Sequence, residues 1–165
     1  MLIYFINYSI QLMIELKLKN LKLSYQKMTD KSLKNKKIII SAGASGIGLA
    51  IAKNCLLKGA YVYLCDINER SINKLKKSFK RNNKVFIYKC DASNEYDVMG
   101  FFNEIKKRTK KIDALINNVG VSGPTGSLEK LDSKEWENTL KVNVLSHFYF
   151  TKLSIPMLKK VKQDQ

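Results

Sequence analysis

The segment Ser41–Gly48 has residue types and a spacing suited to binding a phosphate group. It reads Ser-Ala-Gly-Ala-Ser-Gly-Ile-Gly and joins a β-branched run to a stretch with helical spacing. Glycines there allow a sharp turn and a close approach of backbone N–H groups to a phosphate, and the helix N-terminus adds unpaired donors. A tight turn that binds nothing would show the same glycines. The predicted pyrophosphate-binding residues are Ser41, Gly43, Ser45, Gly46, Ile47 and Gly48.

Carboxylates and amides follow the later apolar runs, where strands are expected to end. Asp66 comes about 20 residues after Gly46, where a carboxylate accepts hydrogen bonds from an adenosine ribose. Because it would repel a 2′-phosphate, Asp66 favours NAD over NADP. Asp91-Ala92 and Asn117–Gly120 follow the next two runs, and ligands of open parallel sheets bind at this edge. The predicted cofactor contacts from these turns are Asp91, Ala92, Asn118, Val119 and Gly120.

Four apolar runs of strand length alternate with helical stretches, and these elements must position the candidate residues. Repeated strand–helix units joined by right-handed crossovers predict an α/β fold, a Rossmann-like doubly wound parallel sheet that stops after about four βα units. Gly59 is predicted to cap the first helix, and Pro156 to bend or end the last one. The expected strands are 37–41, 61–65, 84–88 and 112–116, and the expected helices are 45–58, 68–81, 93–110 and 132–159.

With these motifs the sequence resembles the short-chain dehydrogenases/reductases, from residue 37 to about residue 160. The glycine segment is similar to the family's Thr-Gly-x-x-x-Gly-x-Gly loop, with Ala42 at the first glycine. Asn117–Gly120 is similar to the family's Asn-Asn-Ala-Gly turn, with Val119 for the alanine. Asp91 matches the acid that binds the adenine. Asn143 matches the asparagine of the family's Asn-Ser-Tyr-Lys set, so the resemblance implies a catalytic role for Asn143.

The resemblance implies an NAD(P)-dependent oxidoreductase that transfers hydride between nicotinamide and an alcohol or carbonyl substrate. In the family, the tyrosine of a Tyr-x-x-x-Lys motif exchanges a proton, a serine orients the substrate, and the asparagine holds a helix kink and a water. No tyrosine of this sequence is followed four residues later by lysine, since Tyr149 and Lys152 are only three apart. Family members carry the missing residues on the next strand and helix. We therefore expect an amino-terminal fragment that is inactive alone and has one open sheet edge.

Two other functions stay open. A truncated unit of this fold could hold a dinucleotide, or merely a partner, as a non-catalytic binding module. The formal net charge of +16 raises a nucleic-acid-binding protein as a third class. The charge is mostly scattered lysine in company with Asn, Ile and Tyr, as expected of an AT-rich genome, and the dense cluster Lys106–Lys111 lacks interleaved aromatic residues. We therefore expect no nucleic-acid partner.

Length and composition fit one domain, because the chain has 165 residues of which 45% are hydrophobic. Residues 37–165 are predicted to form the dinucleotide-binding domain, incomplete at its carboxyl end. Residues 1–36 are expected to be a non-native or disordered extension, with the natural start at Met28. The apolar stretch 1–16 is too short to span a membrane, and a weak amphipathic surface helix is the alternative reading.

The three cysteines and the single histidine give no support for a metal site, a disulfide or a catalytic triad. Cys55, Cys65 and Cys90 lie in or beside apolar runs at no metal-ligand spacing, and they predict reduced, buried thiols of a cytoplasmic protein. His147, the single histidine, has no ligand or triad partner near it, so we expect no metal site and a surface or packing role. We expect no membrane partner, and the resemblance implies a homo-oligomer for a full-length protein.

Overall fold

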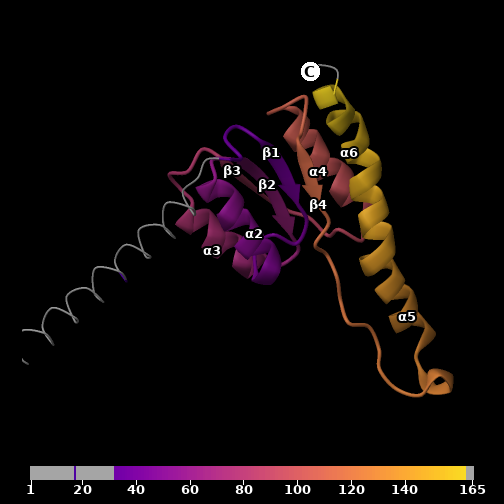
Figure 1. Ribbon diagram of the computed structural model, residues 1–165. Coiled ribbons are helices and arrows are strands. Elements are labelled where there is room, and N and C mark those ends of the chain that lie inside the picture. Colours follow the sequence, from indigo (N-terminus) through magenta and orange to yellow (C-terminus); the bar gives the residue numbers. More distant parts are fainter. Residues whose placement is uncertain (1–16, 18–31, 163–165) are drawn as a thin grey trace, which may run out of the picture.

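The computed structural model of the chain describes residue 17 and residues 32–162. In this part of the chain, four parallel strands form one sheet with helices on both faces (Figure 1), which is the predicted doubly wound α/β architecture. The prediction for residues 1–31 falls outside the described residues except at residue 17. The elements are β1 (Lys37–Ile40), α2 (Gly46–Leu57), β2 (Tyr61–Asp66), α3 (Glu69–Ser78), β3 (Val85–Lys89), α4 (Glu95–Lys106), β4 (Ala114–Ile116), a 3-10 turn η1 (Leu128–Lys130), α5 (Ser133–Leu140), a π-helical segment η2 (Lys141–Leu145) and α6 (Ser146–Lys162).

The strand order brings the carboxyl ends of all four strands to one edge. The order is β3-β2-β1-β4, so β1 lies in the middle, with Ile38 opposite both Val62 of β2 and Ala114 of β4. The turns that follow each strand therefore meet along this edge, where ligands of such sheets bind. Within the described residues, β3 and β4 are the two edge strands.

The strands are buried because their side chains feed two cores, one on each face of the sheet. Ile38 packs with apolar residues of α2 and α3, whereas the neighbouring Ile39 packs with those of α4 and α6. The second core contains the fully buried Phe101, Phe102 and Phe150, whose ring centroids lie 5.7 to 6.1 Å apart. Burial on both faces explains why β1 and β2 are continuous apolar runs.

Polar side chains and one glycine set most helix ends. Asn68, Asn94 and Asp132 cap α3, α4 and α5 by accepting hydrogen bonds from backbone N–H groups of the first turn. Gly59 follows α2 with φ +89°, which confirms the predicted left-handed cap. α3 ends at Ser78, and α4 covers only Glu95–Lys106, so both helices are shorter than expected.

The last predicted helix differs from the expectation in two ways. It is not one regular helix, because the π-helical segment Lys141–Leu145 separates α5 from α6. Pro156 lies inside α6 and does not end it. The lost N–H is offset by packing on both sides of the proline, since Phe150 and Met157 are buried in the sheet core. Ser146 is buried and donates from Oγ to the Val142 carbonyl at 2.5 Å, a contact that bends helices.

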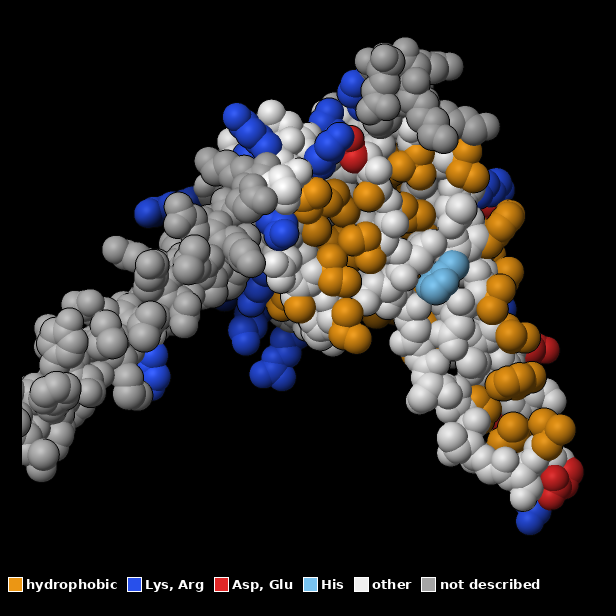
Figure 2. Space-filling view, viewed as in Figure 1, with side chains coloured by type: hydrophobic (Ala, Val, Ile, Leu, Met, Phe, Trp, Pro, Cys, Tyr) orange, Lys and Arg blue, Asp and Glu red, His pale blue; other side chains and the backbone are white. Residues whose placement is uncertain are grey.

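A row of apolar side chains on α5–α6 lies on the surface. Figure 2 shows hydrophobic side chains along the arm that these helices form. The four-residue spacing of this row had predicted a helix, yet its side chains are about half exposed: Trp136 50%, Leu140 47%, Val144 55% and Phe148 55%. The helix therefore presents one apolar face to the sheet and a second one outward.

Residues just before β1 are part of the folded unit. The Leu33 N–H donates to the carbonyl of Lys58 and the Asn35 N–H to that of Gly59, each at 3.1 Å, and the Lys36 carbonyl accepts from the N–H of Tyr61 at 2.7 Å. The ordered domain thus begins before residue 37. No helix in the described part of the chain is both long enough and apolar enough to cross a membrane.

Candidate functional site

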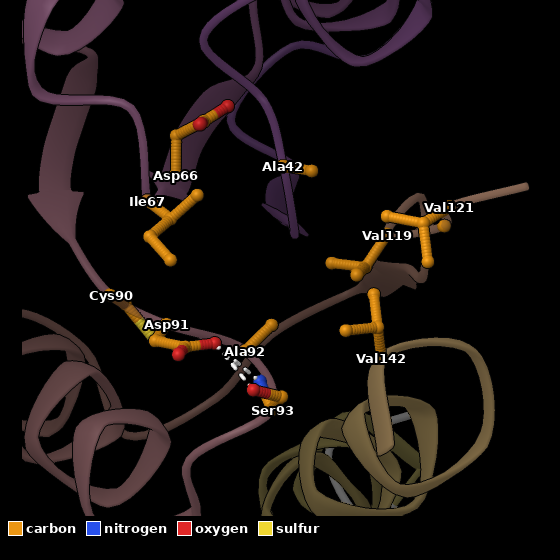
Figure 3. A pocket seen from close by; sticks show the side chains of 11 residues that line it. Ala42, Asp66, Ile67, Cys90, Asp91, Ala92, Ser93, Val119, Val121 and Val142 are labelled. Carbon is orange, nitrogen blue, oxygen red and sulfur yellow. Dashed lines mark hydrogen bonds between the residues drawn. The ribbon is translucent and has the colours of Figure 1, made fainter. Parts of the chain in front are cut away.

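A cavity of about 250 Å³ opens at the carboxyl edge of the sheet, where the sequence predicts ligand binding. Figure 3 shows residues that follow β1, β2 and β3 facing the valines that follow β4. Such a volume is slightly below the range typical of pockets for drug-sized ligands, about 300–1,000 Å³. The lining residues are Ala42, Asp66, Ile67, Cys90, Asp91, Ala92, Ser93, Val119, Gly120, Val121 and Val142.

The glycine loop, residues 41–48, is packed too tightly for side chains at two of its glycines. A Cβ added at Gly43 would lie 2.8 Å from the Cβ of Leu64. A Cβ added at Gly48 would lie 2.3 Å from the Ala42 carbonyl oxygen and 2.6 Å from Nδ2 of Asn118. These glycines therefore serve close packing of the loop on β2 and of α2 on the loop.

The remaining glycine of the loop faces open space at the start of α2. Gly46 has φ +50°, and a Cβ added there would meet no atom within 4 Å. The first intrahelical bond runs from Leu49 N–H to the Ser45 carbonyl at 3.0 Å, so the N–H groups of residues 46–48 precede it. Ser45 is the N-cap residue but makes no side-chain cap bond, and Ile47 is 75% exposed. Unpaired N–H groups at a helix start are the kind of donors that bind anions in proteins.

Ala42 has a strained backbone conformation. It stands where the resembling loop has a glycine, and its φ is +49°, in the left-handed region. For an L-residue with a Cβ this conformation costs about 1–2 kcal/mol. Its methyl group also lies at the pocket (Figure 3).

Asp66 lies at the end of β2 and is almost fully buried. Its Oδ2 accepts from the N–H of Ala44 at 3.0 Å and its Oδ1 from the N–H of Asn68 at 2.9 Å. The carboxylate therefore ties the glycine loop to the turn after β2. Each carboxylate oxygen can accept more than one hydrogen bond, so these contacts leave capacity for a ligand hydroxyl.

Asp91 lies beyond the end of β3, on the pocket wall opposite the valines (Figure 3). Its Oδ1 accepts two hydrogen bonds from Ser93, from the backbone N–H at 2.9 Å and from Oγ at 2.7 Å. Both bonds end on the same oxygen. Ser93 therefore fixes the orientation of the carboxylate, and Ala92 lines the pocket between them.

The turn after β4 is bonded directly to the glycine loop. The N–H of Asn118 donates to Oγ of Ser41 at 3.0 Å, and its Nδ2 donates to the Ala42 carbonyl at 2.9 Å. Ser41 is fully buried between β1 and β4 and donates from its own N–H to the Ile116 carbonyl at 3.1 Å. Ser41 and Asn118 thus position the two walls relative to each other rather than facing the cavity.

Asn143 lies in the π-helical segment and contacts the backbone of Val121. Its Oδ1 accepts from the Val121 N–H and its Nδ2 donates to the Val121 carbonyl, both at 2.8 Å. The side-chain amide therefore both accepts from and donates to the Val121 backbone, as a neighbouring strand would, and it holds the chain in place just after Gly120. This geometry gives Asn143 a positioning role toward the pocket.

The three cysteine thiols are buried and free, and Cys90 is one of the residues that line the pocket. Burial, followed by a hydrogen bond with Cys90, raises the pKa of the Cys65 thiol well above its usual value. A buried thiol that resists ionisation is a poor nucleophile and a poor metal ligand. Cys55 is also buried, and all three cysteines are free, as predicted. Within residues 32–162, no group of three His, Cys, Asp or Glu side chains could hold a metal ion.

The pair Tyr149 and Lys152, the nearest approach to a Tyr-x-x-x-Lys motif, lies away from the pocket lining. Tyr149 packs against the sheet core, and Lys152 Nζ pairs with Glu95 Oε1 at 3.1 Å. Six lining residues were not among the predicted site residues: Ala42, Ile67, Cys90, Ser93, Val121 and Val142. Each of them directly follows or precedes a predicted site residue, so adjacency in the sequence was the available signal.

Comparison with known proteins gives one family. Residues 36–165 match the family model described as short chain dehydrogenase. The short-chain dehydrogenase/reductase family 16C member 6 of Bos taurus is 36% identical over 123 residues, which cover 73% of this chain and 39% of that protein. The L-fucose dehydrogenase of Oryctolagus cuniculus is 30% identical over 125 residues, which cover 76% of this chain and 43% of that protein.

A solved structure has the same fold. The Pseudomonas aeruginosa RhlG/NADP active-site complex is similar with a TM-score of 0.71 and 23% sequence identity, and the match covers 80% of this chain and 51% of that one. The chain thus spans less than half the length of the two curated relatives and about half that of the solved structure.

Proposed function

This chain belongs to the short-chain dehydrogenase family, and from that premise we propose that it binds a nicotinamide dinucleotide with the adenosine half in the pocket between Asp66 and Asp91. The family membership makes it an oxidoreductase by descent. The observation that carries the proposal is the open helix start at Gly46 on the same rim as the buried Asp66 carboxylate, which the N–H of Ala44 joins to the glycine loop. An anion cradle and a hydroxyl acceptor this close match a pyrophosphate next to a ribose.

Each candidate residue has a defined task in this proposal. The N–H groups of residues 46–48 receive the pyrophosphate, and Asp66 accepts from the ribose hydroxyls. Asp91 Oδ2 accepts from the adenine amino group, because Ser93 occupies Oδ1. Ala92, Val119 and Gly120 form the apolar sides that cover the ring.

The nicotinamide would supply hydride transfer to or from an alcohol or carbonyl substrate. The residues of this chain bind and orient the dinucleotide, and Asn143 holds the wall beside it. Proton exchange by a Tyr-x-x-x-Lys pair has no candidate in the 165 residues, since no tyrosine has a lysine four positions later. We therefore expect the chain by itself to bind dinucleotide without turnover, which is also how the alternative, a non-catalytic binding module, would behave.

NAD is the proposed cofactor rather than NADP. Two backbone N–H groups already donate to the buried Asp66 carboxylate, which supports its assignment to the ribose in this proposal. A 2′-phosphate on the ribose would be repelled by the Asp66 carboxylate, to which no cationic side chain is bonded in the described residues. The relative solved with NADP is similar in fold at only 23% identity, so it leaves this preference to experiment.

The proposal extends to partners and compartment. The exposed apolar row on α5–α6 supports a homo-oligomer, because half-exposed Trp and Phe side chains in a row favour association. Three free cysteines support a reducing, cytoplasmic compartment. The sugar dehydrogenase among the relatives supports an alcohol or carbonyl substrate.

Calorimetric titration of the chain with NAD⁺ and with NADP⁺ tests the proposal. We expect NAD⁺ to bind at least about tenfold more tightly than NADP⁺, and Asp66→Ala to weaken NAD⁺ binding by about 10- to 100-fold. Glu137→Ala is the control, because this exposed carboxylate on α5 does not line the pocket. Equal NAD⁺ affinity in wild type and Asp66→Ala would remove Asp66 from its role.

A further inference from the structure

A row of polar side chains on the last helix contacts the segment after β4 at regular intervals. Nδ2 of Asn117 donates to Oγ1 of Thr151 at 3.2 Å, and Nε2 of His147 lies 2.9 Å from the Val119 carbonyl oxygen. Asn143 bonds Val121, as described above. Gly123 continues the series by close approach and not by a bond: an added Cβ there would lie 2.9 Å from both Oγ1 and Cγ2 of Thr139, whose hydroxyl donates to the Glu135 carbonyl.

These four contacts form an antiparallel ladder between helix and segment. The helix residues 139, 143, 147 and 151 are four apart, and the segment residues 123, 121, 119 and 117 are two apart. Four residues of helix rise about 6 Å, and two residues of extended chain span about 6.6 Å. The two spacings match, so each step of two residues along the segment meets one further turn of helix. We call residues 139, 143, 147 and 151 the polar row.

The π-helical segment explains how the polar row stays on one face. In a regular α-helix a step of four residues turns about 40° beyond a full circle, so a row of four positions would drift away from a straight neighbour. A π-helical turn is wider, with i→i+5 bonds, and turns less per residue. The π-helical segment Lys141–Leu145 lies in the middle of the row and reduces this drift.

The ladder holds one wall of the pocket. Val119, Gly120 and Val121 line the cavity together with Val142 of the π-helical segment, and Figure 3 shows these valines opposite Asp91 and Ile67. A shift of the Val119 carbonyl would move this wall toward or away from Asp91. His147 holds that carbonyl at the level of the pocket.

We propose that His147 is a positioning residue of the dinucleotide site, which donates from Nε2–H to the Val119 carbonyl and so sets the width of the pocket. A carbonyl oxygen only accepts, so the bonded ring nitrogen must carry the hydrogen. The neutral ring is therefore the Nε2–H tautomer. The link to cofactor affinity rests on the proposed function, whereas the tautomer and the ladder do not.

The test uses the whole chain in three variants, with NAD⁺ as the probe. His147→Phe keeps a ring but removes the donor, and we expect NAD⁺ affinity to fall about three- to tenfold. His147→Gln carries an amide nitrogen that reaches as far as Nε2, and it should restore affinity to within about twofold of wild type. Lys141→Gln, an exposed change in the same segment, is the control and should match wild type.

A ligand-free measurement separates this proposal from the proposed function. His147 is the only histidine, so its ¹⁵N spectrum is unambiguous. We expect the Nε2–H tautomer, and shifts of the Val119–Val121 amides in His147→Phe but not in His147→Gln. The Nδ1–H tautomer, or unchanged amides in His147→Phe, would overturn the ladder. If wild type binds no NAD⁺ while these spectra appear as expected, the proposed function fails and the positioning contact stands. Wild-type NAD⁺ affinity in His147→Phe would overturn the link to the site.

Discussion

The glycine loop on one side of the pocket and the segment 117–123 on the other are held by different physical means. The glycine loop is positioned by contacts that leave no room for a side chain, as at Gly43 and Gly48. The opposite segment is positioned by hydrogen bonds from helix side chains, chiefly Asn143 and His147. Close packing at Gly43 and Gly48 thus adds to the hydrogen bonds from Asp66 and Asn118 on the first wall, whereas the second wall depends mainly on polar groups of a neighbouring helix.

This difference predicts different tolerance to substitution. A side chain added against backbone atoms is strongly destabilising, because the core is packed at close to crystalline density and the backbone cannot move aside. A hydrogen bond at a partly exposed site contributes about 1 kcal/mol net, because water can replace one partner. The glycine loop should therefore respond to single changes more sharply than the segment 117–123.

Gly48→Ala should have the largest effect. The new methyl group would overlap the Ala42 carbonyl and Nδ2 of Asn118, at 2.3 and 2.6 Å. We expect a loss of about 3 kcal/mol in the free energy of unfolding and the loss of measurable NAD⁺ binding. Urea denaturation and titration with NAD⁺ check both outcomes.

Gly100→Ala is the matched control for Gly48→Ala. Gly100 lies inside α4, and its added Cβ would lie 3.4 Å from the hydroxyl of Tyr88, an ordinary contact. The same substitution there should be neutral or stabilise the chain by up to about 1 kcal/mol. Equal stabilities of the two variants would break the comparison between the two walls.

Asn143→Leu should have an intermediate effect. It removes both hydrogen bonds to the Val121 backbone while keeping a similar volume, and we expect a loss of about 1–2 kcal/mol in the free energy of unfolding. Hydrogen exchange of the Val121 amide should become faster. Asn138→Leu, at an exposed position of α5, should change stability by less than about 0.5 kcal/mol. An unchanged Val121 exchange rate in Asn143→Leu would contradict the role of side chains on this wall.

Ala42→Gly should have the smallest effect, and with the opposite sign. Glycine relieves the left-handed φ of +49°, which should raise the free energy of unfolding by about 1–2 kcal/mol. Glycine also makes the unfolded chain more flexible, which lowers the free energy of unfolding by about 0.4–1 kcal/mol. We expect a net gain of about 0.5–1 kcal/mol and a modest rise in NAD⁺ affinity. Ala50→Gly, the same change within α2, should instead destabilise by about 1 kcal/mol. Destabilisation by Ala42→Gly would show that the loop is not strained there.

The two walls also differ in how far the sequence predicts them. The glycine loop can be predicted from the sequence, because its close packing and the positive φ of Gly46 require glycine. Asp66 and Asp91 can be predicted because each lies at the end of an apolar run that is recognisable as a strand. The ladder is not, since Val119 and Val121 contribute only backbone groups, which any residue has. The signal lay on the helix, where Asn143 and His147 are four residues apart, but four apolar residues repeat at the same spacing and mask it.

The family resemblance implies a helix kink held by Asn143, but the π-helical form of this kink and the continuation of α6 past Pro156 could not be predicted from the sequence. The π-helical segment depends on how Ser146 bonds back to Val142 and on the fit to the segment 117–123. The continuation of α6 past Pro156 depends on burial of Phe150 and Met157. Both are tertiary effects that override local propensity.

The central claim is that a dinucleotide lies along the carboxyl edge, with its pyrophosphate at the start of α2 and its adenosine between Asp66 and Asp91. An ¹⁵N NMR titration of the chain with NAD⁺ tests it directly. The account predicts saturable shifts concentrated in the amides of Gly46, Ile47 and Gly48, and then in those of Ala92 and Gly120. Absence of saturable shifts, or shifts confined to a separate cavity of about 310 Å³ whose lining includes Tyr61 and Arg108, would contradict it.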